Sequence, residues 1–121
     1  MRRALTIALT VLPGMAAALP LLVDNPQMMC GKPPEAYLLE DGMVLGSNYM
    51  ETIEYFCEFD PAINFRWDVD TTTVARVGWC NEPGVITPVI FAFQFGQYEP
   101  GVVHVYFQER GEPQIFTACP E

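Results

Sequence analysis

The sequence predicts an all-β protein, a small antiparallel sandwich or barrel of about seven or eight strands with two disulfides, preceded by a helical signal peptide. Short runs of alternating apolar and polar residues are separated by turn residues. The 11 prolines and 9 glycines are too many for a helical bundle. Half of the 121 residues are hydrophobic and 17% are charged, so the chain is too apolar to be disordered and too short for two ordinary domains.

Residues 1–18 have the layout of a secretory signal peptide. Arg2 and Arg3 give a positive start, an uncharged apolar run spans 4–12, and small residues precede Leu19. The apolar run is far shorter than the ~20 residues of a membrane-spanning helix, although an uncleaved N-terminal anchor is the alternative interpretation. We expect cleavage within a few residues of Ala18, and therefore a periplasmic or secreted protein with no membrane attachment after cleavage.

The mature chain divides into an arm and a single domain. We predict an extended N-terminal arm at 19–35, because Pro33 and Pro34 disfavour a helix or a central strand there. The remaining residues, 36–121, form a single β domain in this prediction.

The first part of the domain is expected to contain a hairpin and a longer strand. A short strand at 36–40 leads through an Asp41-Gly42 turn into a second strand at 43–45. Residues 48–59 fit a capped helix or a strand at 52–59, and we favour the strand because β-branched and aromatic residues dominate. One face of this strand would carry Ile53, Tyr55, Cys57 and Phe59, and the other Thr52, Glu54 and Glu58.

Strict alternation predicts the later strands. It extends over 65–70 and 73–79, is strongest over 89–95 and 102–108, and ends with a strand at 114–118. A register error of one residue would mix apolar and polar faces, so the 89–95 and 102–108 strands should pair in one register only. The predicted pairs are Phe95 with Val103, Phe93 with Val105 and Phe91 with Phe107 on one face, and Gln94 with His104 and Ala92 with Tyr106 on the other.

The four cysteines, Cys30, Cys57, Cys80 and Cys119, predict two disulfides, since an even count is typical of small exported domains. None lies in a C-x-x-C pair, which argues against a zinc site and against a thiol oxidoreductase. Of the three possible pairings we favour Cys30–Cys57 with Cys80–Cys119.

The charge suggests the class of partner. There are 15 acidic residues and 6 basic ones, a formal net charge of −9, which excludes a nucleic-acid binder of the usual electrostatic kind. We predict an exported binding module that recognises a protein, with inhibition of a cationic enzyme as a specific case. A purely solubilising surface is the alternative role of the charge. The candidate binding residues are Tyr49, Glu54, Asp68, Asp70, Trp79, Tyr98 and His104.

Catalysis has little support in the sequence, and we expect no catalytic residues and no cofactor. Asp68 and Asp70 would lie about 6.6–6.8 Å apart on one strand face, a spacing that suits Ca²⁺ or acid–base hydrolysis, but aspartates before threonines also make ordinary turns. His104 is the only histidine, and Ser47, the only serine, lacks the glycine pattern of a nucleophile elbow. A carboxylate-based hydrolase is therefore the least favoured function.

A metal-handling function is the main alternative to protein binding. Met28, Met29, Met43, Met50 and His104 are soft ligand types that suit Cu(I) in an exported protein. Methionine also fills gaps in hydrophobic cores, and no M-x-x-M repeat is present, so no metal ligand is assigned.

Overall fold

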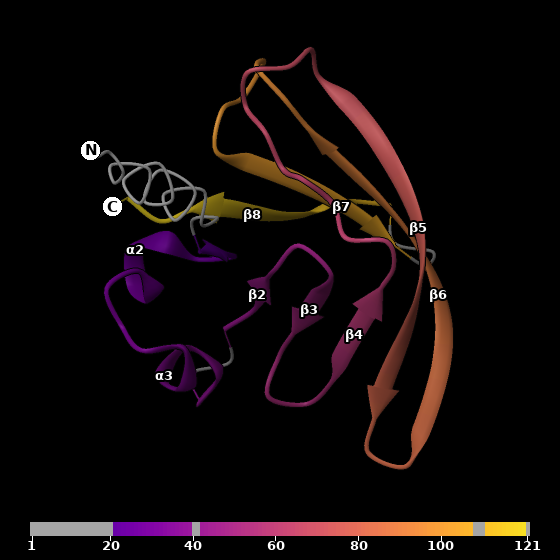
Figure 1. Cartoon of the computed structure of the whole chain (residues 1–121). Helices are drawn as coiled ribbons and strands as arrows, with labels where there is room; N and C mark the ends of the chain where they lie inside the picture. The colour runs from indigo at the N-terminus through magenta and orange to yellow at the C-terminus, as the bar shows by residue number, and fades with distance from the viewer. Residues whose placement is uncertain (1–20, 40–41, 108–110, 121) are drawn as a thin grey trace, which may run out of the picture.

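The computed structural model describes residues 21–39, 42–107 and 111–120. Within these residues, strands β1 to β8 form a closed antiparallel barrel in which each strand pairs with its neighbours along the chain and β8 pairs with β1 (Figure 1). This confirms the all-β prediction and selects the barrel over the sandwich. The strands are β1 (Leu22–Val23), β2 (Val44–Leu45), β3 (Tyr49–Glu51), β4 (Phe56–Phe59), β5 (Thr72–Glu82), β6 (Val85–Phe95), β7 (Val102–Phe107) and β8 (Gln114–Ala118). The predicted signal peptide lies outside the described residues.

The predictions of an extended arm at 19–35 and of a strand at 36–40 are wrong. Residues 22–39 instead contain β1 and two short helices, α2 (Pro26–Met29) and α3 (Pro34–Leu39). Proline opens both helices, at a position where its missing N–H has no helical partner to lose. Asn25 caps α2, its side-chain oxygen accepting from the Met28 N–H. Pro26 and Pro34 therefore mark the starts of helices. The segment predicted as an arm also contributes β1 to the barrel.

Of the strand predicted at 52–59, only the second half forms as β4, and residues 52–55 make the turn that joins it to β3. The strand interpretation was right in type, since β3 and β4 pair and no helix forms there. The Thr52 hydroxyl accepts from the backbone N–H groups of Glu54 and Tyr55, which turns the chain between them. Ile53 consequently lies exposed in the turn, whereas Cys57 and Phe59 are buried.

The strand predicted at 65–70 does not form. This segment connects β4 to β5 without pairing in the sheet, yet its alternating burial is real. Phe65 is buried with its ring edge-on to Phe93 and Phe95, and Trp67 makes a similar contact with Phe95. The alternation therefore reflects rings packed onto the barrel core, and it does not require strand pairing.

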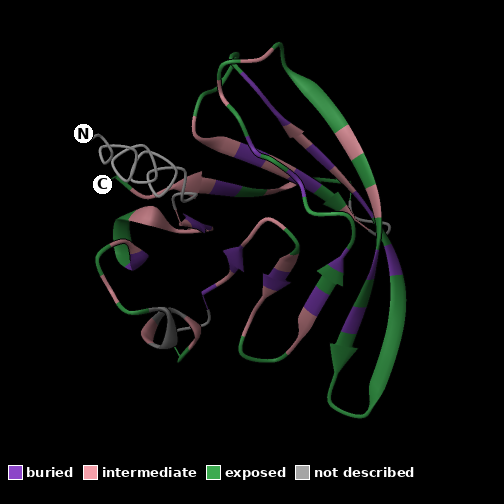
Figure 2. Cartoon of the chain, in the orientation of Figure 1, coloured by how far each residue is buried: buried purple, intermediate pink, exposed green. Residues whose placement is uncertain are grey.

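The later strands follow the prediction closely. β6 and β7 pair in the predicted register, with Phe91 opposite Phe107, Ala92 opposite Tyr106, Phe93 opposite Val105 and Gln94 opposite His104. β8 has the predicted bounds, and β5 and β6 form a long hairpin paired along its whole length. The core inside the barrel is dominated by aromatic rings, with Phe91, Phe93 and Phe116 fully buried, and buried residues alternate with exposed ones along the strands (Figure 2).

All four cysteines form disulfides, as predicted, but the favoured pairing is wrong. The bonds are Cys57–Cys80 and Cys30–Cys119. Cys57 and Cys80 are direct partners across β4 and β5, and β1 pairs with β8, which brings the chain after α2 close to the end of the chain. Both pairings depend on the strand order, which cysteine spacing does not reveal. The two disulfides indicate an oxidising environment outside the cytoplasm.

Neither of the two described helices has the length and apolar character that crossing a membrane requires.

Candidate functional site

The outer side of the β5–β6 hairpin is apolar and exposed. Val77 lies opposite Ile90 and Trp79 lies opposite Pro88, all on the side of the sheet that faces away from the barrel core. Between 55% and 71% of the area of Val77, Trp79, Ile86 and Ile90 is exposed. We call the set of Val77, Trp79, Ile86, Pro88 and Ile90 the hairpin face.

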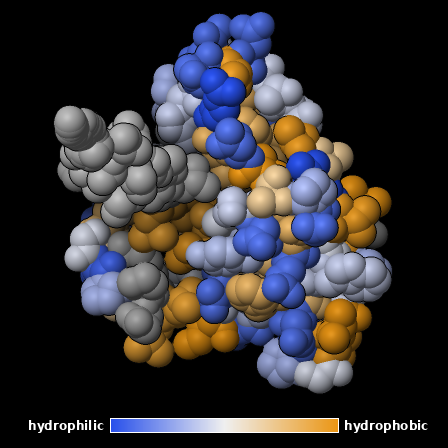
Figure 3. Space-filling model, viewed as in Figure 1, coloured by the Kyte–Doolittle hydropathy of each residue, from blue (hydrophilic) through white to orange (hydrophobic). Residues whose placement is uncertain are grey.

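Strand geometry explains why the hairpin face is apolar. Val89, Phe91 and Phe93 point into the barrel, so the alternate residues of β6 must point outward. A strand that is apolar on both sides is normally covered on both sides. Here the outer side is uncovered in the described structure, and hydrophobic residues reach the surface along the β5–β6 side of the molecule (Figure 3).

The apolar surface continues across the neighbouring strands. Ala92 pairs with Tyr106 of β7, and His104 of β7 pairs with Ile115 of β8, so these side chains share the outer side of the sheet. Tyr106 and Ile115 are 37% and 44% exposed. The hairpin face is thus the centre of a wider outward surface, and not an isolated patch.

An acidic groove borders the hairpin face on the β4 side. It has a volume of about 420 Å³ and is lined by Asn48, Glu58, Phe59, Asp60, Val77 and Trp79. Glu58 lies directly opposite Trp79 in the β4–β5 pairing, so the two side chains are cross-strand neighbours on the outer side of the sheet. Among the described residues, neither Glu58 nor Asp60 has an ion pair or a side-chain hydrogen bond. We call this hollow the acidic groove.

A second hollow lies on the inner side of the same hairpin. It has a volume of about 220 Å³ and its lining includes the Cys57–Cys80 disulfide, Glu82, Val89 and Phe107. Its lining by Glu82, which pairs with Val85 next to the turn, places this hollow near the β5–β6 turn.

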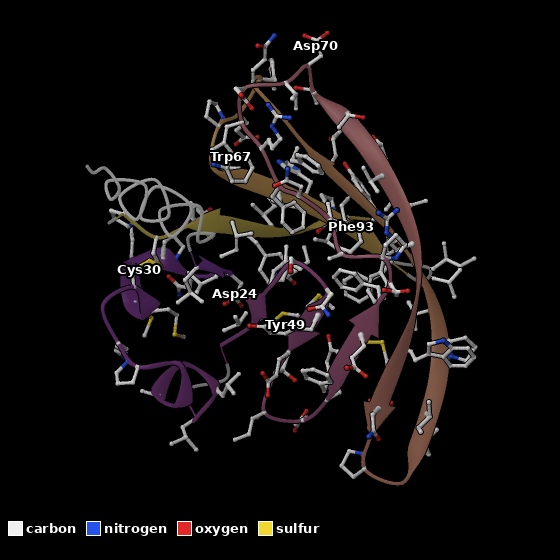
Figure 4. The ribbon with its side chains drawn as sticks, viewed as in Figure 1. Asp24, Cys30, Tyr49, Trp67, Asp70 and Phe93 are labelled. Carbon is white, nitrogen blue, oxygen red and sulfur yellow. A yellow bond between two sulfur atoms is a disulfide. The ribbon has the colours of Figure 1, made fainter. Side chains whose placement is uncertain are left out.

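Three of the predicted binding residues come together at another place, the loop between β6 and β7. The Gln97 amide donates to Asp70 at 3.1 Å, and the Tyr98 N–H donates to the Thr71 hydroxyl at 3.2 Å. His104 Nε2 lies 3.0 Å from a Glu99 carboxylate oxygen. Asp70, Tyr98 and His104 thus share one end of the barrel, and Asp70 lies far from Tyr49 (Figure 4).

Asp68 and Asp70 do not form the carboxylate pair that a strand would have aligned. Arg66 donates two hydrogen bonds to Asp68, at 2.9 and 3.0 Å, whereas Asp70 is held by Gln97. The hydrogen bond from Arg66 lowers the pKa of Asp68. Each carboxylate is thus engaged with a different polar partner.

The other predicted residues are scattered. Tyr49 is half-buried and stacks on Phe56 with 5.7 Å between ring centroids, and Glu54 is exposed in the β3–β4 turn. Trp79 is the one predicted residue on the hairpin face. Glu58, Asp60 and the aliphatic members of the face were not among the predicted binding residues. The sequence signal that could have revealed the face is that β6 also carries apolar residues, such as Ile86 and Ile90, at the positions that alternate with its inward ones.

The methionines are dispersed as well. Met50 is buried in the main core cluster, Met29 is buried in a smaller cluster with Val23 and Val44, and Met28 is exposed. No group of three or more His, Cys, Asp or Glu side chains among the described residues is placed to hold a metal ion.

A scan of protein-family models and searches of curated proteins and of solved structures all ended without a match to this chain.

Proposed function

We propose that this protein is an exported, non-catalytic binding module that docks a protein partner with its hairpin face, and that the partner carries positive charge. The observation that supports it is the exposed apolar surface of β5 and β6 with the acidic groove at its edge. Inhibition of a cationic enzyme is a specific form of this function.

Interface energetics support this use of the surface. Contiguous exposed apolar surface on a soluble domain is a mark of an interaction site. Tryptophan is enriched among the residues that dominate binding energy, and Trp79 lies in the centre of the hairpin face with Pro88 opposite it. The exposed β-branched neighbours Val77, Ile86 and Ile90 would exclude water around it.

Charge favours a basic partner over a second copy of the chain. The full chain carries −9, and the acidic groove places two carboxylates beside the apolar surface. Two copies meeting at this surface would bring like charges together, whereas a cationic protein would be attracted and steered toward it. Association with such a partner should slow markedly as salt is added.

In the test, the oxidised mature protein is immobilised and used to capture exported proteins from the cells that produce it. The association and dissociation rates of each purified partner are then measured. We expect basic partners whose association rate falls at least about tenfold between roughly 0.05 and 0.5 M salt. Ile90→Asn on the hairpin face should weaken binding, and Ile53→Asn, at an exposed isoleucine in the β3–β4 turn, should not. Equal effects of the two variants, or partners without a basic bias, would contradict the proposal.

A further inference from the structure

We infer that the acidic groove is the specificity pocket of this surface and that it receives one arginine side chain of the partner, stacked on Trp79 and paired with Glu58 and Asp60. The inference rests on the proposed function, because it names the partner chemistry that this surface selects. Three features of the groove support it.

The first feature is the aromatic wall. Trp79 lines the groove and is 57% exposed, so its ring is accessible to a ligand from the solvent. Indole is the best side-chain partner for a cation held over its ring, and the attraction grows as water is excluded. The apolar hairpin face, which begins at Val77 and Trp79, would exclude that water when a partner covers it.

The second feature is the pair of carboxylates. Glu58 is held opposite Trp79 by the strand register, and Asp60 follows directly after the end of β4. Neither is neutralised by a basic side chain among the described residues. Arg76 precedes Val77 in the chain, but its guanidinium donates to the carbonyl oxygens of Pro61 and Ala75. Within the described part of the chain, the two carboxylates of the groove therefore form no ion pair with a basic side chain.

The third feature is the shape of the cation that fits. A guanidinium is flat, stacks on an aromatic ring and presents a fork of N–H donors that can serve two acceptors at once. A lysine ammonium is a compact point charge with stronger hydration and gains less from stacking. A groove of about 420 Å³ with an indole wall and two carboxylates therefore favours arginine over lysine.

The experiment uses the fluorescence of Trp79. The chain has two tryptophans, so Trp67→Phe leaves Trp79 as the only indole. This variant is titrated with N-acetyl-arginine amide, with the citrulline analogue, which has the same shape without the charge, and with N-acetyl-lysine amide. Calorimetry on the unaltered protein repeats the titration, so that the result does not depend on the Trp67 substitution.

We expect saturable binding of the arginine amide, binding at least about threefold weaker for the lysine amide, and none for the citrulline analogue. Glu58→Gln and Asp60→Asn should each weaken arginine binding about five- to tenfold, whereas the control Glu112→Gln, at an exposed residue between β7 and β8, should leave it unchanged. Equal binding of citrulline and arginine, or lysine binding as tightly as arginine, would overturn the inference.

The two proposals can fail separately. If a partner is captured and Ile90→Asn weakens it, but arginine amide does not bind, the specificity pocket is wrong and the docking surface stands. If arginine amide binds and Glu58→Gln weakens that binding, but no protein is captured through the hairpin face, the pocket is right and the proposed function is wrong.

Discussion

Among single residues, Gly96 allows the β6–β7 loop to lie close against the β4–β5 connection. It follows the last residue of β6 with a φ of +148°, and a Cβ placed on it would clash with the Thr71 Cα and lie 2.7 Å from the Thr71 nitrogen. The adjoining Gln97 N–H donates to the Val69 carbonyl at 2.9 Å. The absence of a side chain at Gly96 is what lets the β4–β5 connection approach the β6–β7 loop.

Gly96→Ala should therefore lower the free energy of unfolding by more than about 2 kcal/mol, because the clash is with backbone that cannot move aside easily. Gly84, in the β5–β6 turn, also has a positive φ, of +85°, but a Cβ at this position would have no neighbouring atom within 4 Å. Gly84→Ala should cost only about 1 kcal/mol, from the backbone conformation alone. Urea unfolding measures both, and equal losses would show that contact with Thr71 is not the cause.

At the scale of elements, β6 has two apolar sides with opposite roles. Phe93 is fully buried in a cluster of rings, with 4.8 Å between its centroid and that of Phe59. Ile90, three residues earlier on the outer side, is 71% exposed. The apolar side chain of Phe93 therefore stabilises the barrel core, whereas the apolar side chain of Ile90 is exposed to solvent.

Phe93→Ala should cost about 3–5 kcal/mol of stability, because it leaves a cavity among packed rings. Ile90→Ala should change stability by less than about 0.5 kcal/mol, since little of its contact area is buried. Both values come from urea unfolding monitored by circular dichroism. A loss above about 1 kcal/mol for Ile90→Ala would mean that the hairpin face contributes to folding and is a poorer candidate for a docking surface.

The same strand shows what the sequence could and could not predict. The β6–β7 register was predictable because Phe91 and Phe93 must share one face with Val105, whatever the rest of the chain does. The alternation at 65–70 predicted burial correctly but not pairing, because loop rings packed on a core alternate as strand residues do. The acidic groove was not predictable, since it depends on Glu58 lying opposite Trp79 across residues distant in sequence.

At the scale of the whole molecule, the disulfides and the proposed leader make a joint prediction. The four cysteines are paired, which requires an oxidising compartment, and export through a cleaved leader would supply it. Intact mass spectrometry of the native product should give a chain that begins within a few residues of Leu19 and does not react with a thiol-alkylating reagent before reduction. Retention of Met1 together with four alkylated cysteines would contradict export.

The two disulfides close loops of different length, so they should restrict the unfolded chain to different extents. Cys30–Cys119 closes a separation of 89 residues and ties the segment after β1 to the residue after β8, whereas Cys57–Cys80 closes 23 residues across adjacent strands. In the chain-entropy description the longer loop restricts the unfolded ensemble more, by about 1 kcal/mol.

The urea m-value is the sharper measurement, because the alanine pair at Cys57 and Cys80 also removes buried sulfur from the core. Replacing Cys30 and Cys119 by alanine frees most of the chain to expand when unfolded, so the m-value should rise more than in the Cys57–Cys80 alanine pair. The unaltered protein is the reference for both. An equal rise in the two variants would mean that the unfolded chain without the Cys30–Cys119 disulfide is no more expanded than the one without the Cys57–Cys80 disulfide.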